Sequence, residues 1–283
     1  MIDRALQAGQ RLYKAVASID PMAILPMITP LAQDLIRTIP TALFHGRALD
    51  VGTGLGIVAK QLAQHPLSVV GLDLSEAMLR VAARLNDPRN PVHYVCADLL
   101  QPPLASASFD LIVASFGLNL TAPHQSLRQL RRLLKPGGGL IIQEWATEDA
   151  LSSDFDRTFM THMNQNASVD QQLTGFIDLP DTWSEQMQDL DDYRDQLEAA
   201  GFETNVVNEG TPKAVAIESD AFIAYRLAWP TYRYQWNGLD KASQEALYQD
   251  LTTTIMRHAT AAGELLWRPP LFRIVATIPK TIT

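Results

Sequence analysis

The chain has 283 residues, a formal net charge of −8 and one cysteine, Cys96, which excludes a disulfide framework or a cysteine-cluster zinc site. Its acidity makes nucleic-acid binding unexpected, although a local basic patch is not excluded. No apolar run approaches the ~20 residues that span a bilayer, and the N-terminus lacks the apolar core of a signal peptide. We therefore expect a cytoplasmic protein without a membrane span.

The first 146 residues predict an α/β fold. Residues 1–40 suggest helices interrupted by prolines at positions 21, 26, 30 and 40. From residue 48, short apolar segments alternate with amphipathic ones, which predicts βαβ units in a parallel, doubly wound sheet with its ligand site at the carboxyl ends of the strands. The expected strands are 48–51, 68–73, 92–96, 109–115 and 139–144, and the expected helices are 57–64, 75–84 and 126–134.

The regular alternation stops after residue 144. The segments 147–183 and 211–267 are too long for ordinary loops, so we interpret them as insertions that cap the ligand-binding edge. The stretch from Glu148 to Glu198 has 13 acidic and two basic residues, which is typical of a solvated face and would repel anionic partners. The remaining expected elements are helices at 184–200, 219–229 and 242–262 and strands at 202–207 and 270–278.

Chemistry-bearing residues follow the first three strands. The glycine-rich turn Asp50-Val-Gly-Thr-Gly-Leu-Gly56 lets a ligand approach the backbone and presents amide N–H groups to it. Asp73 ends the second strand, where a carboxylate can accept both ribose hydroxyls of a nucleoside. Asp98 follows the third strand, where it can accept from an exocyclic amine. A plain tight turn or a helix cap explains any one of these alone; together they indicate a nucleotide-like ligand.

These residues belong to a larger set of motifs. In chain order they are Leu49-Asp-Val-Gly-Thr-Gly-Leu-Gly56, Gly71-Leu-Asp-Leu-Ser-Glu-Ala-Met-Leu79, Cys96-Ala-Asp-Leu99, Ser108-Phe-Asp-Leu-Ile112 and Leu133-Leu-Lys-Pro-Gly-Gly138. In order and spacing the stretch from Ala48 to Trp145 resembles the class I methyltransferases that use S-adenosylmethionine (SAM). The resemblance implies a Rossmann-like sheet of seven strands, SAM as the cofactor and S-adenosylhomocysteine as its product.

The resemblance also implies how the chain is divided and where the cofactor binds. The expected parts are a helical N-terminal lid (1–40), a SAM-binding core (41–146), an acidic insertion (147–183), a continuation of the core (184–210), a helical cap (211–267) and a final core strand (268–283). The implied cofactor residues are Asp50, Gly52, Thr53, Gly54 and Gly56 at the methionine part, Asp73 at the ribose, Leu74, Met78, Asp98 and Leu99 at the adenine, and Ser115 near the sulfonium.

Two neighbouring families are less compatible with the sequence. A nicotinamide-dependent dehydrogenase requires glycine or alanine where this chain has Ile57.

Within the methyltransferases, the stretch from Ala114 to Leu120 resembles the quinone-biosynthetic C-methyltransferases. Those enzymes carry an Arg-Asn pair after the Gly-Leu, whereas here Gly117-Leu118 is followed by Asn119-Leu120. The missing arginine argues against quinol chemistry.

The acceptor side of the predicted site carries weaker signals. The stretch 224–236 is dense in aromatic residues, so Tyr225, Trp229 and Tyr232, together with Tyr13, are candidates for an acceptor pocket; packing of a cap is the alternative. His124, His162 and His258 are the candidate bases, with packing or surface positions as the alternative. No metal site is expected.

The predicted function is transfer of a methyl group from SAM to a small molecule, of a secondary-metabolite or quinone-like kind. The predicted cap and the acidic charge favour a small enclosed acceptor. A protein or RNA acceptor is the alternative within the same chemistry. A SAM-binding partner subunit without catalysis is the alternative from another class, and turnover to S-adenosylhomocysteine distinguishes the two.

Overall fold

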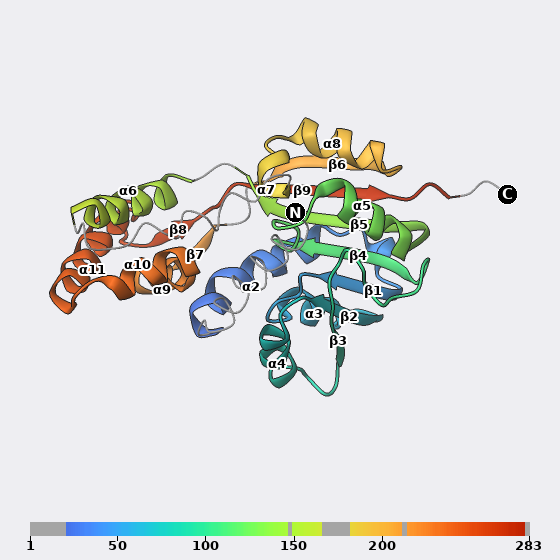
Figure 1. Ribbon diagram of the computed structural model, residues 1–283, viewed down its shortest axis with the longest axis horizontal. Coiled ribbons are helices and arrows are strands. Elements are labelled where there is room, and N and C mark those ends of the chain that lie inside the picture. The colour runs from blue at the N-terminus through green and yellow to red at the C-terminus, as the bar shows by residue number, and fades with distance from the viewer. Residues whose placement is uncertain (1–20, 147–148, 166–181, 211–213, 281–283) are drawn as a thin grey trace.

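The computed structural model describes residues 21–146, 149–165, 182–210 and 214–280. Its centre is a seven-stranded sheet in the order β3-β2-β1-β4-β5-β9-β6 (Figure 1). Only β9 runs antiparallel to its neighbours, which confirms the predicted doubly wound α/β sheet. The strands are β1 (Gly46–Val51), β2 (Leu67–Asp73), β3 (Val92–Cys96), β4 (Phe109–Ser115), β5 (Leu134–Trp145), β6 (Glu203–Gly210) and β9 (Leu271–Thr277).

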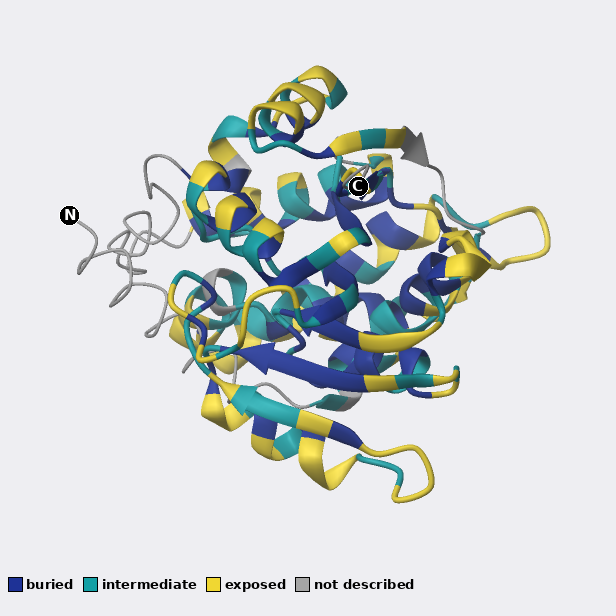
Figure 2. Cartoon of the chain, turned by 90° about the vertical axis from the view of Figure 1, so that its right-hand side faces the viewer, coloured by how far each residue is buried: buried dark blue, intermediate teal, exposed yellow. Residues whose placement is uncertain are grey.

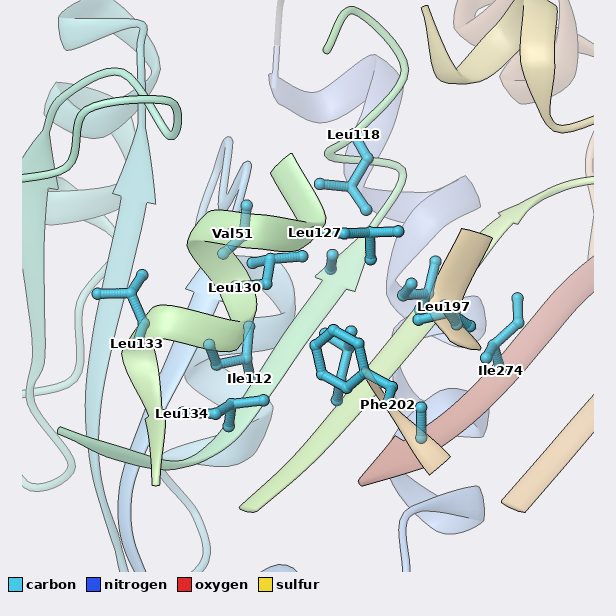
Figure 3. Close-up of a cluster of buried hydrophobic side chains, with 14 of the residues drawn as sticks. Val51, Ile112, Leu118, Leu127, Leu130, Leu133, Leu134, Leu197, Phe202 and Ile274 are labelled. Carbon is cyan, nitrogen blue, oxygen red and sulfur yellow. The ribbon is translucent and has the colours of Figure 1, made fainter. Parts of the chain in front are cut away.

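Helices cover both faces of this sheet. One face packs against α5 (Pro123–Leu133) and α8 (Leu190–Ala199), whose leucines meet Val51, Ile112 and Ile274 of the strands (Figure 3). The other face packs against α2 (Pro21–Thr38), α3 (Ile57–Leu62) and α4 (Glu76–Arg84). Successive strand residues alternate between these two cores, as the period of two requires. The central strands are accordingly buried along most of their length (Figure 2).

The expectation of helices broken by prolines is wrong at Pro26 and Pro30, whereas α2 does end before Pro40. Helix α2 is continuous, with Pro26 and Pro30 inside it. Each proline leaves one carbonyl of the preceding turn without its intrahelical donor. Met27, Leu31 and Leu35, however, follow one another at the spacing of a helix face, and all three are fully buried. Burying such side chains contributes about 1.5–3 kcal/mol each, which offsets the lost hydrogen bonds.

A second hydrophobic core lies beside the sheet, on the left of Figure 1. The expected helices near 219–229 and 242–262 are present as α9 and α11, but the sequence did not predict α6, α10 or the two-stranded sheet of β7 and β8. Helix α2 also joins this core, through Met27 and Leu31. The elements are α6 (Ala150–Gln165), β7 (Val215–Ile217), α9 (Ser219–Ala228), α10 (Pro230–Gly238), α11 (Lys241–Met256) and β8 (Leu265–Trp267).

Several other boundaries also differ from the expectation; for example, α11 ends at Met256 rather than at residue 262. The helix expected at 184–200 is divided into α7 (Trp183–Gln186) and α8, because the Asp189 carboxylate accepts from the N–H groups of Asp191 and Asp192 and starts a new helix. Strand β5 begins at Leu134 rather than at residue 139, and its pairing with β4 is interrupted between Phe109 and Leu111. The short 3-10 helix η1 (Thr41–Leu43) leads into β1.

Candidate functional site

The glycine-rich turn after β1 has a backbone that only glycine adopts without strain. Gly52, Gly54 and Gly56 have φ values of 65°, 51° and 70°. A Cβ atom on Gly52 would lie 2.5 Å from the Cα atom of Gly117, and one on Gly56 would lie 2.3 Å from the hydroxyl of Tyr94. The turn is therefore held between the segment that follows β4 and a side chain of β3, with no room for a side chain at Gly52 or Gly56.

Asp50 stabilises this turn through hydrogen bonds. Its Oδ2 atom accepts a hydrogen bond from the Thr53 hydroxyl (2.6 Å) and another from the N–H of Ala59 (3.0 Å). Asp50 is 2% exposed, and this burial raises its pKa to about 7 although the two hydrogen bonds act in the opposite direction. Asp50 and Thr53 thus fix the shape of the turn, and Asp50 joins it to the first turn of α3.

Asp73 joins the glycine turn to the next helix. Its Oδ2 accepts from the N–H of Gly54 and its Oδ1 from the N–H of Ser75, each at 2.8 Å. Ser75 in turn caps α4 by accepting from the N–H of Met78 at 3.3 Å. Burial raises the pKa of Asp73, and the two backbone hydrogen bonds oppose that rise. Each carboxylate oxygen retains a lone pair, so the group can still accept from two ligand hydroxyls.

The other predicted cofactor residues lie along the same strand ends. Asp98 follows β3 and accepts from the N–H of Leu100 at 2.8 Å. Leu74 and Met78 are half-buried beside Asp73, whereas the side chain of Leu99 is buried in the core. Ser115 ends β4, is half-buried and accepts a hydrogen bond from Gln143 (3.1 Å). The structure thus brings the glycine turn, Asp73, Asp98 and Ser115 to one edge of the sheet.

The three candidate bases are not brought to this edge together. His162 lies 2.7 Å from Asp250, an ion-pair contact between α6 and α11. His258 contacts Asp154 at 2.9 Å and links the end of α11 to α6. His124 is exposed at the start of α5. The structure therefore gives two of these histidines packing partners far from the glycine turn. Tyr13, the remaining candidate for the acceptor pocket, lies outside the described residues.

A series of aromatic rings connects the sheet edge to the second core. Phe116, which follows β4 with a left-handed φ of 57°, stacks on Trp145 at 4.2 Å between ring centroids. The series continues from Trp145 to Trp267 (6.0 Å), from Trp267 to Tyr225 (5.9 Å) and from Tyr225 to Trp229 (6.0 Å). We call these five rings the aromatic junction. The sequence had singled out only two of them.

Tyr232, the other predicted pocket residue, is engaged elsewhere. Its hydroxyl donates to Asp156 (2.6 Å) and accepts from Arg226 (2.7 Å). The Arg226 guanidinium lies over the rings of Phe155 and Tyr232, at 5.2 and 5.0 Å from the centroids. Tyr232 therefore belongs to a polar cluster between α6, α9 and α10 rather than to the aromatic junction.

Sequence reasoning missed a buried carboxyl beside the predicted site. Glu144, near the end of β5, is 3% exposed, and its Oε1 accepts from the N–H of Leu118 at 3.3 Å. Within the described residues its Oε2 has no hydrogen-bond partner, and burial raises the pKa of Glu144 to about 8. Glu144 thereby holds the segment 116–118, which packs against Gly52. Its partner is 26 positions away, so local sequence gives no signal of the contact.

Comparison with known proteins gives the class of this site. Residues 49–142 match the methyltransferase domain family. The chain is 40% identical over 102 residues to a demethylmenaquinone methyltransferase of Clavibacter sepedonicus, covering 36% of this chain and 42% of that protein. It is 36% identical over 117 residues to a ubiquinone/menaquinone biosynthesis C-methyltransferase of Geotalea daltonii, covering 36% of this chain and 47% of the relative. The matches thus span less than half the length of these relatives.

A solved structure supports the fold over a longer stretch. Phosphoethanolamine N-methyltransferase 2 of Haemonchus contortus, determined with S-adenosylhomocysteine, superposes with a TM-score of 0.52 at 19% identity and covers 87% of this chain and 52% of its own. The family match and the sequence relatives assign residues 49–142 to a class I SAM-dependent methyltransferase domain, and the solved structure adds support for the fold. Outside that domain, the fold alone is what the chain shares with solved structures.

Three further observations concern possible metal binding, membrane crossing and a second cavity. Among the described residues, no group of three or more His, Cys, Asp or Glu side chains is arranged to hold a metal ion. In the same part of the chain, no helix is both long and apolar enough to cross a membrane. A cavity of about 290 Å³ lies between α2 and α3, lined by Leu25, Thr29, Ile57, Lys60, Gln61, Gln64, Asp87 and Asn90. None of the predicted cofactor residues lines it, so it is separate from the candidate site.

Proposed function

We propose that this protein transfers a methyl group from SAM to a small-molecule acceptor. The main support for the proposal is that the glycine turn and the Asp73 carboxylate are hydrogen-bonded to each other. The N–H groups of Gly54 and Ser75 both donate to the Asp73 carboxylate, and each of its oxygens retains a lone pair for a ligand hydroxyl. Such a pairing suits a ligand with an elongated charged part and a vicinal diol. SAM has both.

The residues present fit that cofactor. The absence of side chains on Gly52 and Gly56 lets the turn pack closely against Gly117 and Tyr94, which fixes its shape, and Asp73 provides a rigid carboxylate for the ribose. Asp98 and Leu100 form a turn at the adenine end. When bound, SAM supplies a methyl group already activated by its sulfonium. The protein therefore needs chiefly to orient the acceptor and exclude water.

For the acceptor, we propose a small molecule with a flat apolar ring. The aromatic junction runs from Phe116, next to the glycine turn, to Trp229 in the second core. Stacked and tilted rings of this kind favour a planar apolar partner. The names of two sequence relatives refer to quinone methylation, so a quinol is one acceptor to test, although this chain has Asn119-Leu120 in place of the Arg-Asn pair of those enzymes. The segments 147–183 and 211–267 would then form the cap over the acceptor.

Calorimetric titration with SAM, followed by assays for S-adenosylhomocysteine, tests the proposal. The acceptors are a reduced 2-alkyl-1,4-naphthoquinone and a panel of small phenols, with a protein extract and total RNA as the alternative acceptors. We expect SAM binding and product formation with a small molecule. Absence of SAM binding contradicts the cofactor assignment. Product formation only with protein or RNA contradicts the acceptor class, and SAM binding without any turnover indicates a non-catalytic subunit.

A further inference from the structure

Four polar side chains from four elements form a continuous hydrogen-bonded series that ends at Ser115. Asp34 of α2 pairs with Arg273 of β9 (Oδ2 to Nη1, 2.8 Å). The Nε–H of Arg273 donates to Oε1 of Gln143 on β5 (3.0 Å), and Nε2 of Gln143 donates to the Ser115 hydroxyl on β4 (3.1 Å). Strand register sets this row, because Ser115 pairs with Gln143 and Gln143 with Arg273.

The chemistry of the series fixes the direction of every hydrogen bond in it. A guanidinium has donors only, so the amide oxygen of Gln143 must face Arg273. The amide NH₂ of Gln143 must then face Ser115, and the Ser115 oxygen must accept. The Ser115 proton is consequently directed away from Gln143. A serine hydroxyl that is free to rotate has no such constraint.

Burial makes this arrangement rigid. The Gln143 side chain is fully buried, and the side chains of Arg273 and Asp34 are 12% and 14% exposed. A buried charge requires its partner, so Asp34 holds Arg273 in place. Ser115 itself is half-buried. Two residues further on, Gly117 lies against the backbone of Val51 and Gly52, so Ser115 stands beside the glycine turn.

We propose that Asp34, Arg273 and Gln143 are positioning residues that make Ser115 a hydrogen-bond donor to the carboxylate of the methionine part of SAM. The inference rests on the proposed function. A hydroxyl restricted to donating selects a group with lone pairs. The methionine part offers its carboxylate, because its ammonium and sulfonium groups accept no hydrogen bond.

Gln143→Glu is the decisive variant, because it keeps the size of the side chain and its pairing with Arg273. A carboxylate only accepts, so Ser115 must turn its proton toward position 143 and loses it for the ligand. We expect Gln143→Glu and Ser115→Ala each to weaken SAM binding by roughly 10- to 150-fold, the effect of losing a hydrogen bond to a charged group. Ser115→Thr, which retains the hydroxyl, should restore most of the affinity.

Titration with 5′-methylthioadenosine separates this role from a merely structural one, since that compound lacks the amino and carboxylate groups. Its affinity should be unchanged in both variants. In the Ser115→Ala background, Gln143→Glu should add no further loss, whereas simple charge repulsion of SAM by the new carboxylate would persist. The control is Gln129→Glu on α5, because Gln129 also accepts from an arginine, Arg132, although it is half-buried where Gln143 is fully buried.

Three results would overturn the inference. They are wild-type SAM affinity in Gln143→Glu, an equal loss for SAM and 5′-methylthioadenosine in Ser115→Ala, and an undiminished effect of Gln143→Glu when Ser115 is already alanine. If the wild-type chain binds neither compound, the proposed function itself fails. That outcome differs from all three, because in each of them the wild type binds SAM. Melting temperatures of all variants, measured alongside, report whether they are folded.

Discussion

At the scale of single residues, Asp73 links the glycine turn to the start of α4. Both of its oxygens accept from backbone N–H groups, one in the glycine turn and one before α4. Asp73→Ala removes the proposed ribose contacts and releases Gly54. Losing hydrogen bonds to a carboxylate costs about 1.5–3 kcal/mol, so we expect SAM affinity to fall roughly 10- to 150-fold in a calorimetric titration. Unchanged affinity would remove Asp73 from the site.

Asp98→Asn should have a smaller effect than Asp73→Ala. The asparagine oxygen can still accept from the N–H of Leu100 or from the adenine amine. We expect less than a tenfold loss of SAM affinity, from the removal of the charge, with a nearly unchanged melting temperature. If Asp98→Asn abolished binding in a folded protein, a role in adenine recognition would not account for Asp98.

Glu144 should make stability depend on pH. Burial raises its pKa from 4.5 to about 8, so the folded state retains a proton that the unfolded state releases above pH 4.5. Its contribution to stability is therefore fully present below about pH 4.5 and is lost as the pH rises to about 8. Glu144→Gln keeps the acceptor for Leu118 and has no charge to bury. Its melting temperature should exceed that of the wild type at pH 8 and approach it at pH 5.

The control for this prediction is Glu76→Gln, an exposed carboxylate on α4 that pairs with Arg80. An exposed pair contributes about 0–1 kcal/mol, so this variant should retain the pH dependence of the wild type. Parallel curves for the wild type and Glu144→Gln between pH 5 and pH 8 would show that Glu144 titrates normally.

At the scale of elements, the glycine turn offers a matched pair of substitutions. Gly52 and Gly263 both have positive φ values, 65° and 81°, but a Cβ atom on Gly263 would have nothing within 4 Å. Gly263→Ala should therefore cost only the backbone strain, about 1–2 kcal/mol, and leave SAM affinity unchanged. Gly52→Ala adds a contact of 2.5 Å with the backbone of Gly117, so it should lower both stability and SAM affinity.

Calorimetric titration and thermal unfolding of the two variants distinguish the two effects. An equal loss of stability with wild-type SAM affinity in both would mean that the turn adapts to a side chain and does not contact the ligand closely.

The elements that were predicted correctly are those whose signal is local. The strands of the sheet and the positions of Asp73 and Asp98 after them follow from short apolar runs bounded by turns. Helix α6 was missed because its buried face, which includes Phe155 and Phe159, is specified by packing against α11 and by no local signal. Pro26 and Pro30 suggested breaks because the burial that compensates for them is tertiary.

The distinction between local signals and contacts of distant residues also applies to the candidate site. Local sequence identified the glycine turn, but Glu144 with Leu118 and Gln143 with Arg273 are contacts between distant positions; the latter two are 130 residues apart. Predicting them requires the strand register. Strand β9 runs antiparallel between β5 and β6. The pattern of residues 270–278 predicts a strand, but it specifies neither that direction nor the residues with which the strand pairs.

At the scale of the whole molecule, helix α2 and strand β8 are two of the described elements that link the sheet to the second core. Helix α2 contributes Leu35 to one side of the sheet and Leu31 to the second core. Strand β8 of the second core leads within a few residues into β9, which lies inside the sheet (Figure 1). The aromatic junction lies where these connections meet. A ligand held there would contact both parts, so acceptor binding and packing of the second core should be coupled.

Trp229→Ala tests whether the junction contacts the acceptor. Trp229 lies between α9 and α10, is half-buried and meets Tyr225 edge to face at 6.0 Å. Removing its ring should cost less than the roughly 3–5 kcal/mol of a fully buried aromatic side chain. We expect the KM for any acceptor that the wild type uses to rise about tenfold or more, the loss of roughly 1.4 kcal/mol of binding, while SAM affinity stays unchanged.

Trp236→Ala is the matched control, because Trp236 is also half-buried and packs edge to face, but against Tyr248 of α11 and outside the junction. Both variants should lower the melting temperature, since each removes ring contacts within the second core. Only Trp229→Ala should raise the acceptor KM, because only its ring belongs to the series that reaches Phe116 beside the glycine turn. A lower melting temperature with an unchanged KM in Trp229→Ala would mean that this ring only packs the second core and does not contact the acceptor.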